Sequence, residues 1–209
     1  MRPLPRLHAV TDAAVLALAD FPVRAAAIAA AGSAVALHAR DRAATATALL
    51  GVTTRLLALA RPAEASVAVN ARADIAVALE THGLQLGAGD LAPRDVRRTF
   101  PRWSGWIGAS VHSLEEAQAR QDEEADYLLV GNIFETRTHP GRPATGLGLI
   151  QQVAKLGLPV IAIGGMTPER VRAVRDAGAW GVAAIGALWH ADDPAAAALG
   201  LLEPWAEAA

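Results

Sequence analysis

One pattern repeats along the whole chain and restricts its fold more than any other feature. A short run of β-branched or apolar residues is followed by a longer stretch of helical character, and the pair recurs eight times. Such alternation is typical of a parallel sheet, because each strand needs a crossover helix to reach the next. The predicted strands are Leu7–Val10, Ala34–His38, Ser66–Val69, Gly83–Leu86, Trp106–Ser110, Tyr127–Gly131, Val160–Gly164 and Gly181–Ile185.

Periodicity alone does not separate a closed barrel from an open doubly wound sheet, but the count of eight strands favours the barrel. We therefore predict an α/β fold, a single (β/α)8 TIM barrel that occupies residues 1–209 as one domain. Ser113–Glu116 has the spacing of a capping box, and Thr167–Pro168 and Asp193–Pro194 each place a cap residue before a proline. Gly178 predicts the end of the helix that begins after Thr167.

Composition excludes several classes of function. The chain has no cysteine, which removes disulfides, thiolate catalysis and cysteine-bound metals. A net charge of −2 without a basic run argues against nucleic acid as a partner. Alanine dominates the 53% hydrophobic fraction, and neither a membrane span nor a signal peptide is present, so we expect a cytoplasmic protein without a membrane partner.

The strongest chemical signal follows the last two predicted strands. Gly164 and Gly165 end a buried run and precede a capped helix, and Gly186 ends the next strand. Glycine allows close approach of the backbone to an anion, and free N–H groups near a helix N-terminus favour negative charge. We predict a phosphate site at these glycines, although glycines also serve in ordinary tight turns.

Other polar residues follow the ends of earlier strands, so a barrel brings them to one mouth. Arg40 has a fork suited to a carboxylate or phosphate, and His38 alternates with it on the same strand face. The remaining candidates are Asn70, Asp90, Ser110, His112 and Asn132. Each of them alone is also an ordinary turn, cap or structural residue. The loop 132–146, which contains His139, has the composition of a mobile lid.

Several segments resemble the thiamine phosphate synthase/thiazole tautomerase family in its usual order. They are Leu7–Asp12, Val69–Asp74 and Leu84–Asp90, and the resemblance extends over nearly the whole chain. Four further segments are most similar to the thiazole tautomerase (TenI) branch: Ser110–Ala117, Ala125–Tyr127, Phe134–Thr136 and Pro159–Pro168. The resemblance implies a barrel enzyme of thiamine biosynthesis that acts on a small phosphorylated thiazole.

The tautomerase branch implies proton transfer that aromatises a thiazole carboxylate phosphate, without a metal or another cofactor. The resemblance places the phosphate at the glycines and Arg40 near the substrate's other polar end. Asn132 stands where the branch carries a histidine, and an amide cannot act as a general base. We therefore expect Asn132 to orient the substrate, while His112, His38 or a lid residue such as His139 moves the proton.

Three other functions stay open. The synthase joins a pyrimidine pyrophosphate to a thiazole phosphate with Mg²⁺ held by two acids; Asp90 matches the second acid, but Ala71 stands at the first. A binding protein without turnover is the second alternative, and a sugar-phosphate isomerase or aldolase is the third. The only lysine, Lys155, falls in a predicted helix, which argues against Schiff-base chemistry. Because family members often pair, the resemblance adds a homodimer as an expectation.

Overall fold

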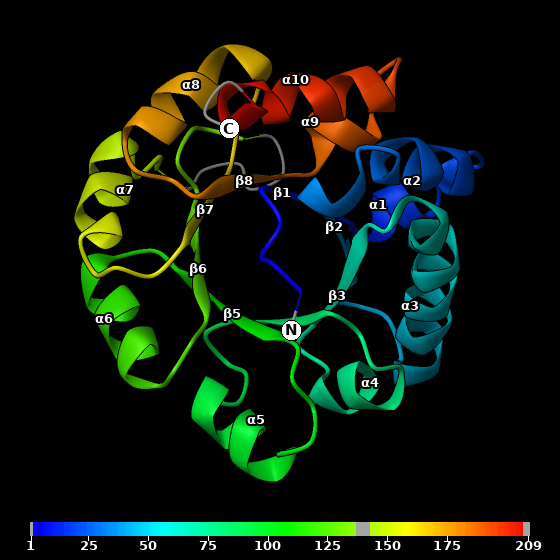
Figure 1. Cartoon of the computed structure of the whole chain (residues 1–209), viewed down its shortest axis with the longest axis horizontal. Helices are drawn as coiled ribbons and strands as arrows, with labels where there is room; N and C mark the ends of the chain where they lie inside the picture. Colours follow the sequence, from blue (N-terminus) through cyan, green and yellow to red (C-terminus); the bar gives the residue numbers. More distant parts are fainter. Residues whose placement is uncertain (1, 137–142, 207–209) are drawn as a thin grey trace.

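Eight parallel strands pair in chain order and close into a ring, since β8 also pairs with β1 (Figure 1). The computed structural model describes residues 2–136 and 143–206. The predicted TIM barrel is confirmed. The strands are β1 (Leu7–Val10), β2 (Val35–Ala39), β3 (Ser66–Asn70), β4 (Gly83–Leu86), β5 (Trp106–Val111), β6 (Tyr127–Gly131), β7 (Val160–Ile163) and β8 (Gly181–Ala184).

Helices cover the outside of this ring (Figure 1). The α-helices are α1 (Ala13–Leu16), α2 (Phe21–Ala29), α3 (Ala46–Ala60), α4 (Ala73–Ala78), α5 (Pro93–Thr99), α6 (Leu114–Asp122), α7 (Leu147–Ala154), α8 (Pro168–Asp176), α9 (Gly186–Trp189) and α10 (Pro194–Ala206). The short 3₁₀ helices η1 (Gly32–Ala34) and η2 (Arg61–Ala63) precede β2 and β3. Among the described helices, none has both the length and the apolar character that crossing a membrane requires.

Local chemistry explains where the helices begin and end. Ser113 caps α6 by accepting a hydrogen bond from Glu116 N, and Asp193 accepts two at the start of α10. Gly178 follows α8 at φ +104°, a conformation that glycine adopts without strain. The capping box at Ser113 is incomplete, because the Glu116 carboxylate accepts from His112 N instead. Each of these signals involves residues within about one helical turn of each other, so the sequence alone could predict where these helices begin and end.

Two apolar clusters pack against the two faces of the ring of strands. The larger lies between the strands and the helices, and the smaller fills the barrel interior around Trp106 and Tyr127. Glycines leave space for these two rings: a Cβ at Gly83 would come 2.5 Å from Trp106, and one at Gly108 would come 2.1 Å from Tyr127. The interior is therefore a packed core, and the main cavity lies beyond the carboxyl ends of the strands.

The first residues of the chain lie at the amino ends of the strands. Their trace crosses the opening of the ring, where Leu4 packs on the interior cluster and Arg2 O accepts a hydrogen bond from Trp106 Nε1 (Figure 1). This end of the barrel is covered, whereas the carboxyl ends of the strands carry the cavity described below.

Candidate active site

A cavity of about 930 Å³ opens at the carboxyl ends of the strands. This volume suits a small organic ligand. Of the site residues predicted from sequence, those lining the cavity are Arg40, Asn70, Ser110, His112, Asn132, Gly164, Gly165 and Gly186. His38 and Asp90 do not line it, and His139 lies outside the described residues. The barrel thus brings together groups that are far apart in sequence.

Sequence reasoning missed several further residues of the lining. Asp12, Arg170 and His190 line the cavity, and Arg42 does so while remaining exposed. Asp12 lies two residues after the end of β1, so the strand-end rule that selected the other candidates also applied to it. Arg170 lies inside α8 and His190 follows α9, where a charged side chain has no distinguishing pattern.

The glycines after β7 are needed for close packing as well as for exposed backbone. Gly164 has φ +105°, and a Cβ there would come 2.6 Å from Asn132 Cβ. Gly165 has φ +63°, and its Cβ would come 2.7 Å from Glu135 O. Within the described part of the chain, the N–H groups of Gly165 and Gly186 donate no hydrogen bond. Both residues line the cavity, Gly165 shortly before α8 and Gly186 at the start of α9, and unpaired N–H groups at such positions suit a phosphate.

Arg40 supplies positive charge from β2. Thr11 holds its backbone, because Thr11 Oγ1 accepts from Arg40 N at 2.9 Å and also lies 2.9 Å from Arg40 O. Among the described residues, no side chain forms a hydrogen bond or ion pair with its guanidinium. Burial, followed by the positive charge of Arg42, lowers the pKa of Arg40, yet an arginine stays protonated at neutral pH. A half-buried, unpaired cation with a planar fork is a ready partner for an anion.

A chain of polar groups runs beneath the cavity. Asn70 Oδ1 lies 3.2 Å from His38 Nδ1, and His38 Nε2 lies 2.8 Å from His8 Nδ1. Burial lowers the pKa of His38 to about 4, with Arg40 adding to the effect. His38 is therefore neutral at pH 7, and it lies below the cavity floor with both ring nitrogens engaged. Its predicted role as the base stays a prediction, and this placement does not favour it.

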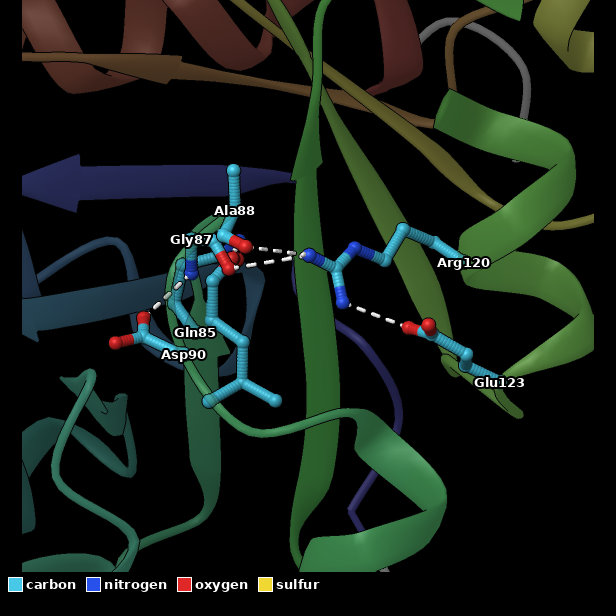
Figure 2. A network of polar contacts seen from close by, with 7 residues as sticks. Gln85, Gly87, Ala88, Asp90, Arg120 and Glu123 are labelled. Carbon is cyan, nitrogen blue, oxygen red and sulfur yellow. Dashed lines mark hydrogen bonds and ion pairs between the residues drawn. The ribbon is translucent and has the colours of Figure 1, made fainter. Parts of the chain in front are cut away.

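Asp90 lies in the loop after β4 and helps to shape that loop. Figure 2 shows its carboxylate turned toward Gly87, whose N–H donates to Asp90 Oδ2 at 2.7 Å. From α6, Arg120 donates to the carbonyl oxygens of Gly87 and Ala88 and pairs with Glu123 at 2.6 Å (Figure 2). Gly87 and Ala88 line the cavity, so this network holds backbone against the ligand space. Asp90 itself stands behind that backbone.

His112 and Asn132 follow β5 and β6. His112 Nδ1 contacts the carbonyl oxygen of Gly131, and a carbonyl only accepts, so Nδ1 carries a proton. In the neutral ring the lone pair is then on Nε2, which is the form a general base needs. Asn132 Nδ2 lies 3.4 Å from Phe134 O, and Ser110 Oγ accepts from Gln85 Nε2 at 3.1 Å. His112 is thus better placed than His38 to move a proton.

The residues after β3 and β4 do not fit the Mg²⁺ that the synthase resemblance implies. Asp90 already binds Gly87 N–H through one oxygen, and Ala71 offers only a methyl group. Within residues 2–136 and 143–206, no three His, Asp or Glu side chains are grouped closely enough to hold a metal ion. Mg²⁺ keeps several waters and is usually bound through one or two carboxylates plus substrate phosphates, and here Asp90 offers one partly engaged carboxylate where the resemblance implies two.

Comparisons with known proteins found a matching family and several relatives. The family model described as "Thiamine monophosphate synthase" matches residues 7–188. The thiamine-phosphate synthase of Thermus thermophilus is 41% identical over 171 residues, which is 81% of each chain. That of Mycolicibacterium vanbaalenii is 45% identical over 66% of this chain and 63% of its own. The solved thiamine phosphate pyrophosphorylase from Pyrococcus furiosus superposes with a TM-score of 0.82 at 30% identity, covering 97% of this chain and 96% of that chain.

These relatives revise the expectation from the tautomerase branch. The named relatives above are synthases or pyrophosphorylases, and none carries the name of a thiazole tautomerase. A solved 3-hexulose-6-phosphate synthase superposes with a TM-score of 0.71 at only 19% identity, so that likeness concerns the fold alone.

Proposed function

Because the chain belongs to the thiamine monophosphate synthase family, we propose that it forms thiamine phosphate from a pyrimidine pyrophosphate and a thiazole phosphate. The observation that supports this most is the agreement with the Thermus thermophilus synthase, which is 41% identical over 81% of both chains. This proposal replaces the tautomerase as the first choice. As a member of the family, the chain is an enzyme of thiamine biosynthesis.

The cavity offers two places for anions, which suits two phosphorylated substrates. The N–H groups of Gly165 and Gly186 would bind the thiazole phosphate. Arg40 and Arg42 would bind the pyrophosphate, which leaves with the electrons of its bond to the pyrimidine's carbon as the new bond to the thiazole forms. In this chain, arginines would supply much of the charge neutralisation that the leaving group needs.

The experiment is a synthase assay with purified protein, pyrimidine pyrophosphate and thiazole phosphate, with and without Mg²⁺. Thiamine phosphate formation is expected, and it should be lost in Arg40→Ala while thermal unfolding stays cooperative. If no product forms in either the presence or the absence of Mg²⁺ while thiazole phosphate still binds, the synthase proposal is rejected. That pattern would favour a binding protein without this turnover.

The tautomerase is a second candidate, and the geometry of His112 favours it. Its Nδ1 proton is held by Gly131 O, which leaves Nε2 to accept a proton from a thiazole carboxylate phosphate. Asn132, in the same cavity, would hold the carboxylate. Aromatisation followed by absorbance tests this candidate, and His112→Gln should lower kcat by roughly 100-fold or more if the imidazole is the base. An unchanged rate in that variant would remove His112 from the reaction.

A further inference from the structure

The barrel interior contains a continuous chain of polar contacts that begins at the cavity and ends near the covered opening. Asn70 lines the cavity, and its side-chain amide lies 3.2 Å from His38 Nδ1. His38 Nε2 lies 2.8 Å from His8 Nδ1, and His8 Nε2 lies 3.2 Å from the carbonyl oxygen of Pro5. Both imidazoles have an exposed fraction of 0%. Three contacts therefore need three protons, and solvent supplies none of them.

The number of protons on the two rings is limited. Burial lowers the pKa of His38 to about 4 and that of His8 well below its ordinary value. Tyr127 packs on His8 with ring centroids 5.4 Å apart, and the charge of Arg40 further disfavours a second cation. At neutral pH each ring is thus uncharged and carries one proton. Two ring protons must serve three contacts.

The orientation of the Asn70 amide decides whether the two ring protons are sufficient for the three contacts. If the amide oxygen faces His38, it can only accept, so His38 must carry its proton on Nδ1. His38 Nε2 is then an acceptor, and His8 must carry its proton on Nδ1 to donate to it. His8 Nε2 would then direct a lone pair at Pro5 O, and two buried acceptors would face each other. If a half-turn of the amide presents its nitrogen to His38, Asn70 supplies the third proton. Every contact then has one donor and one acceptor.

We infer that Asn70 donates from Nδ2 to His38 Nδ1, that both histidines carry their proton on Nε2, and that the Asn70 carbonyl oxygen faces the cavity. Asn70 is then an acceptor for the ligand, and the group it recognises must be an N–H or O–H donor. His38 acts as a positioning residue, because it holds the amide in this orientation from below. Since the inference follows from proton counting, it holds for either reaction proposed above.

The test is a long-range ¹H–¹⁵N correlation spectrum of the ¹⁵N-labelled full chain at pH 7, which reports which nitrogen of each ring is protonated. Spectra of His8→Gln and His38→Gln assign the signals of the two rings. Protonated Nε2 on both His8 and His38 is expected, with a hydrogen-bond coupling between Asn70 Nδ2 and His38 Nδ1. Protonated Nδ1 on both rings, or a doubly protonated ring, would overturn the inference. No turnover is needed, so this result is independent of the proposed function.

A pair of matched variants adds a second readout. Asn70→Asp keeps the shape of the side chain but can only accept, so His38 must move a proton to Nδ1. Asn132→Asp makes the same chemical change at another asparagine of the cavity and should leave both rings unchanged. If Asn70→Asp also leaves His38 unchanged, the amide oxygen already faced His38 and the assignment is wrong. The wild-type spectrum decides the matter by itself if this variant fails to fold.

Discussion

Replacing Arg40 with methionine should make the protein more stable and its ligand binding weaker at the same time. The guanidinium is half-buried at the end of β2, and burial lowers its pKa. In the described part of the chain it has no hydrogen-bonded partner, although the negative charges of Asp12 and Asp41 act on it. Folding therefore desolvates part of a cation without giving it a direct contact.

The two effects have different magnitudes. Full burial of an ion costs several kcal/mol, so a half-buried cation with two acidic neighbours should cost about 1 kcal/mol. Removing it should raise Tm by about 2–4 °C for a chain of this size. A charge-assisted hydrogen bond contributes about 1.5–3 kcal/mol, so the affinity for inorganic pyrophosphate should fall roughly 10- to 150-fold.

Circular dichroism on heating measures the first effect, and titration calorimetry with inorganic pyrophosphate measures the second. Arg42→Met is the matched control, because Arg42 lines the same cavity but is exposed. Its Tm should change little and its affinity should fall less, since solvent screens an exposed charge. A lower Tm together with unchanged pyrophosphate affinity in Arg40→Met would refute the reasoning. Arg40 would then stabilise the fold through contacts of its guanidinium within the protein.

Three further outcomes are expected. Gly165→Ala places a methyl group 2.7 Å from Glu135 O at φ +63°, so titration should show at least about 10-fold weaker binding of thiazole phosphate; unchanged affinity would remove this loop from the phosphate site. Ala71→Asp, at φ +64° where Asp is better tolerated than Ala, should fold and bind Mg²⁺ more tightly by calorimetry, and equal affinity would contradict the metal argument. The lowered pKa of His38, about 4 in the folded protein, means that the unfolded chain binds the proton first as pH falls from about 6.5. Stability in urea should thus drop by on the order of 3 kcal/mol toward pH 4, and less in His38→Gln; parallel profiles of the two proteins would show that burial of His38 is not the cause.

Several parts of this protein were determined by the sequence itself. The strands and the helix starts after Ser113, Thr167 and Asp193 were predicted to within about a residue, because apolar periodicity and helix-start signals are local properties, although the Thr167 side chain forms no cap hydrogen bond. Most of the candidates selected by the rule that strand ends meet at the mouth of a barrel, including Arg40 and His112, do line the cavity. Composition also limits the available chemistry, since a chain without cysteine has no thiolate to offer.

Other properties were decided only by the tertiary structure. His38 and Asp90 follow the same strand-end rule, yet one is buried beneath the cavity and the other stands behind the Gly87 backbone. Their environment depends on His8 and Arg120, which lie 30 and 33 residues from His38 and Gly87 and approach only when the barrel closes. Hydrogen-bond partners, and with them the protonation of a ring or the direction of a carboxylate, are set by such long-range contacts. Local sequence patterns do not predict these long-range contacts.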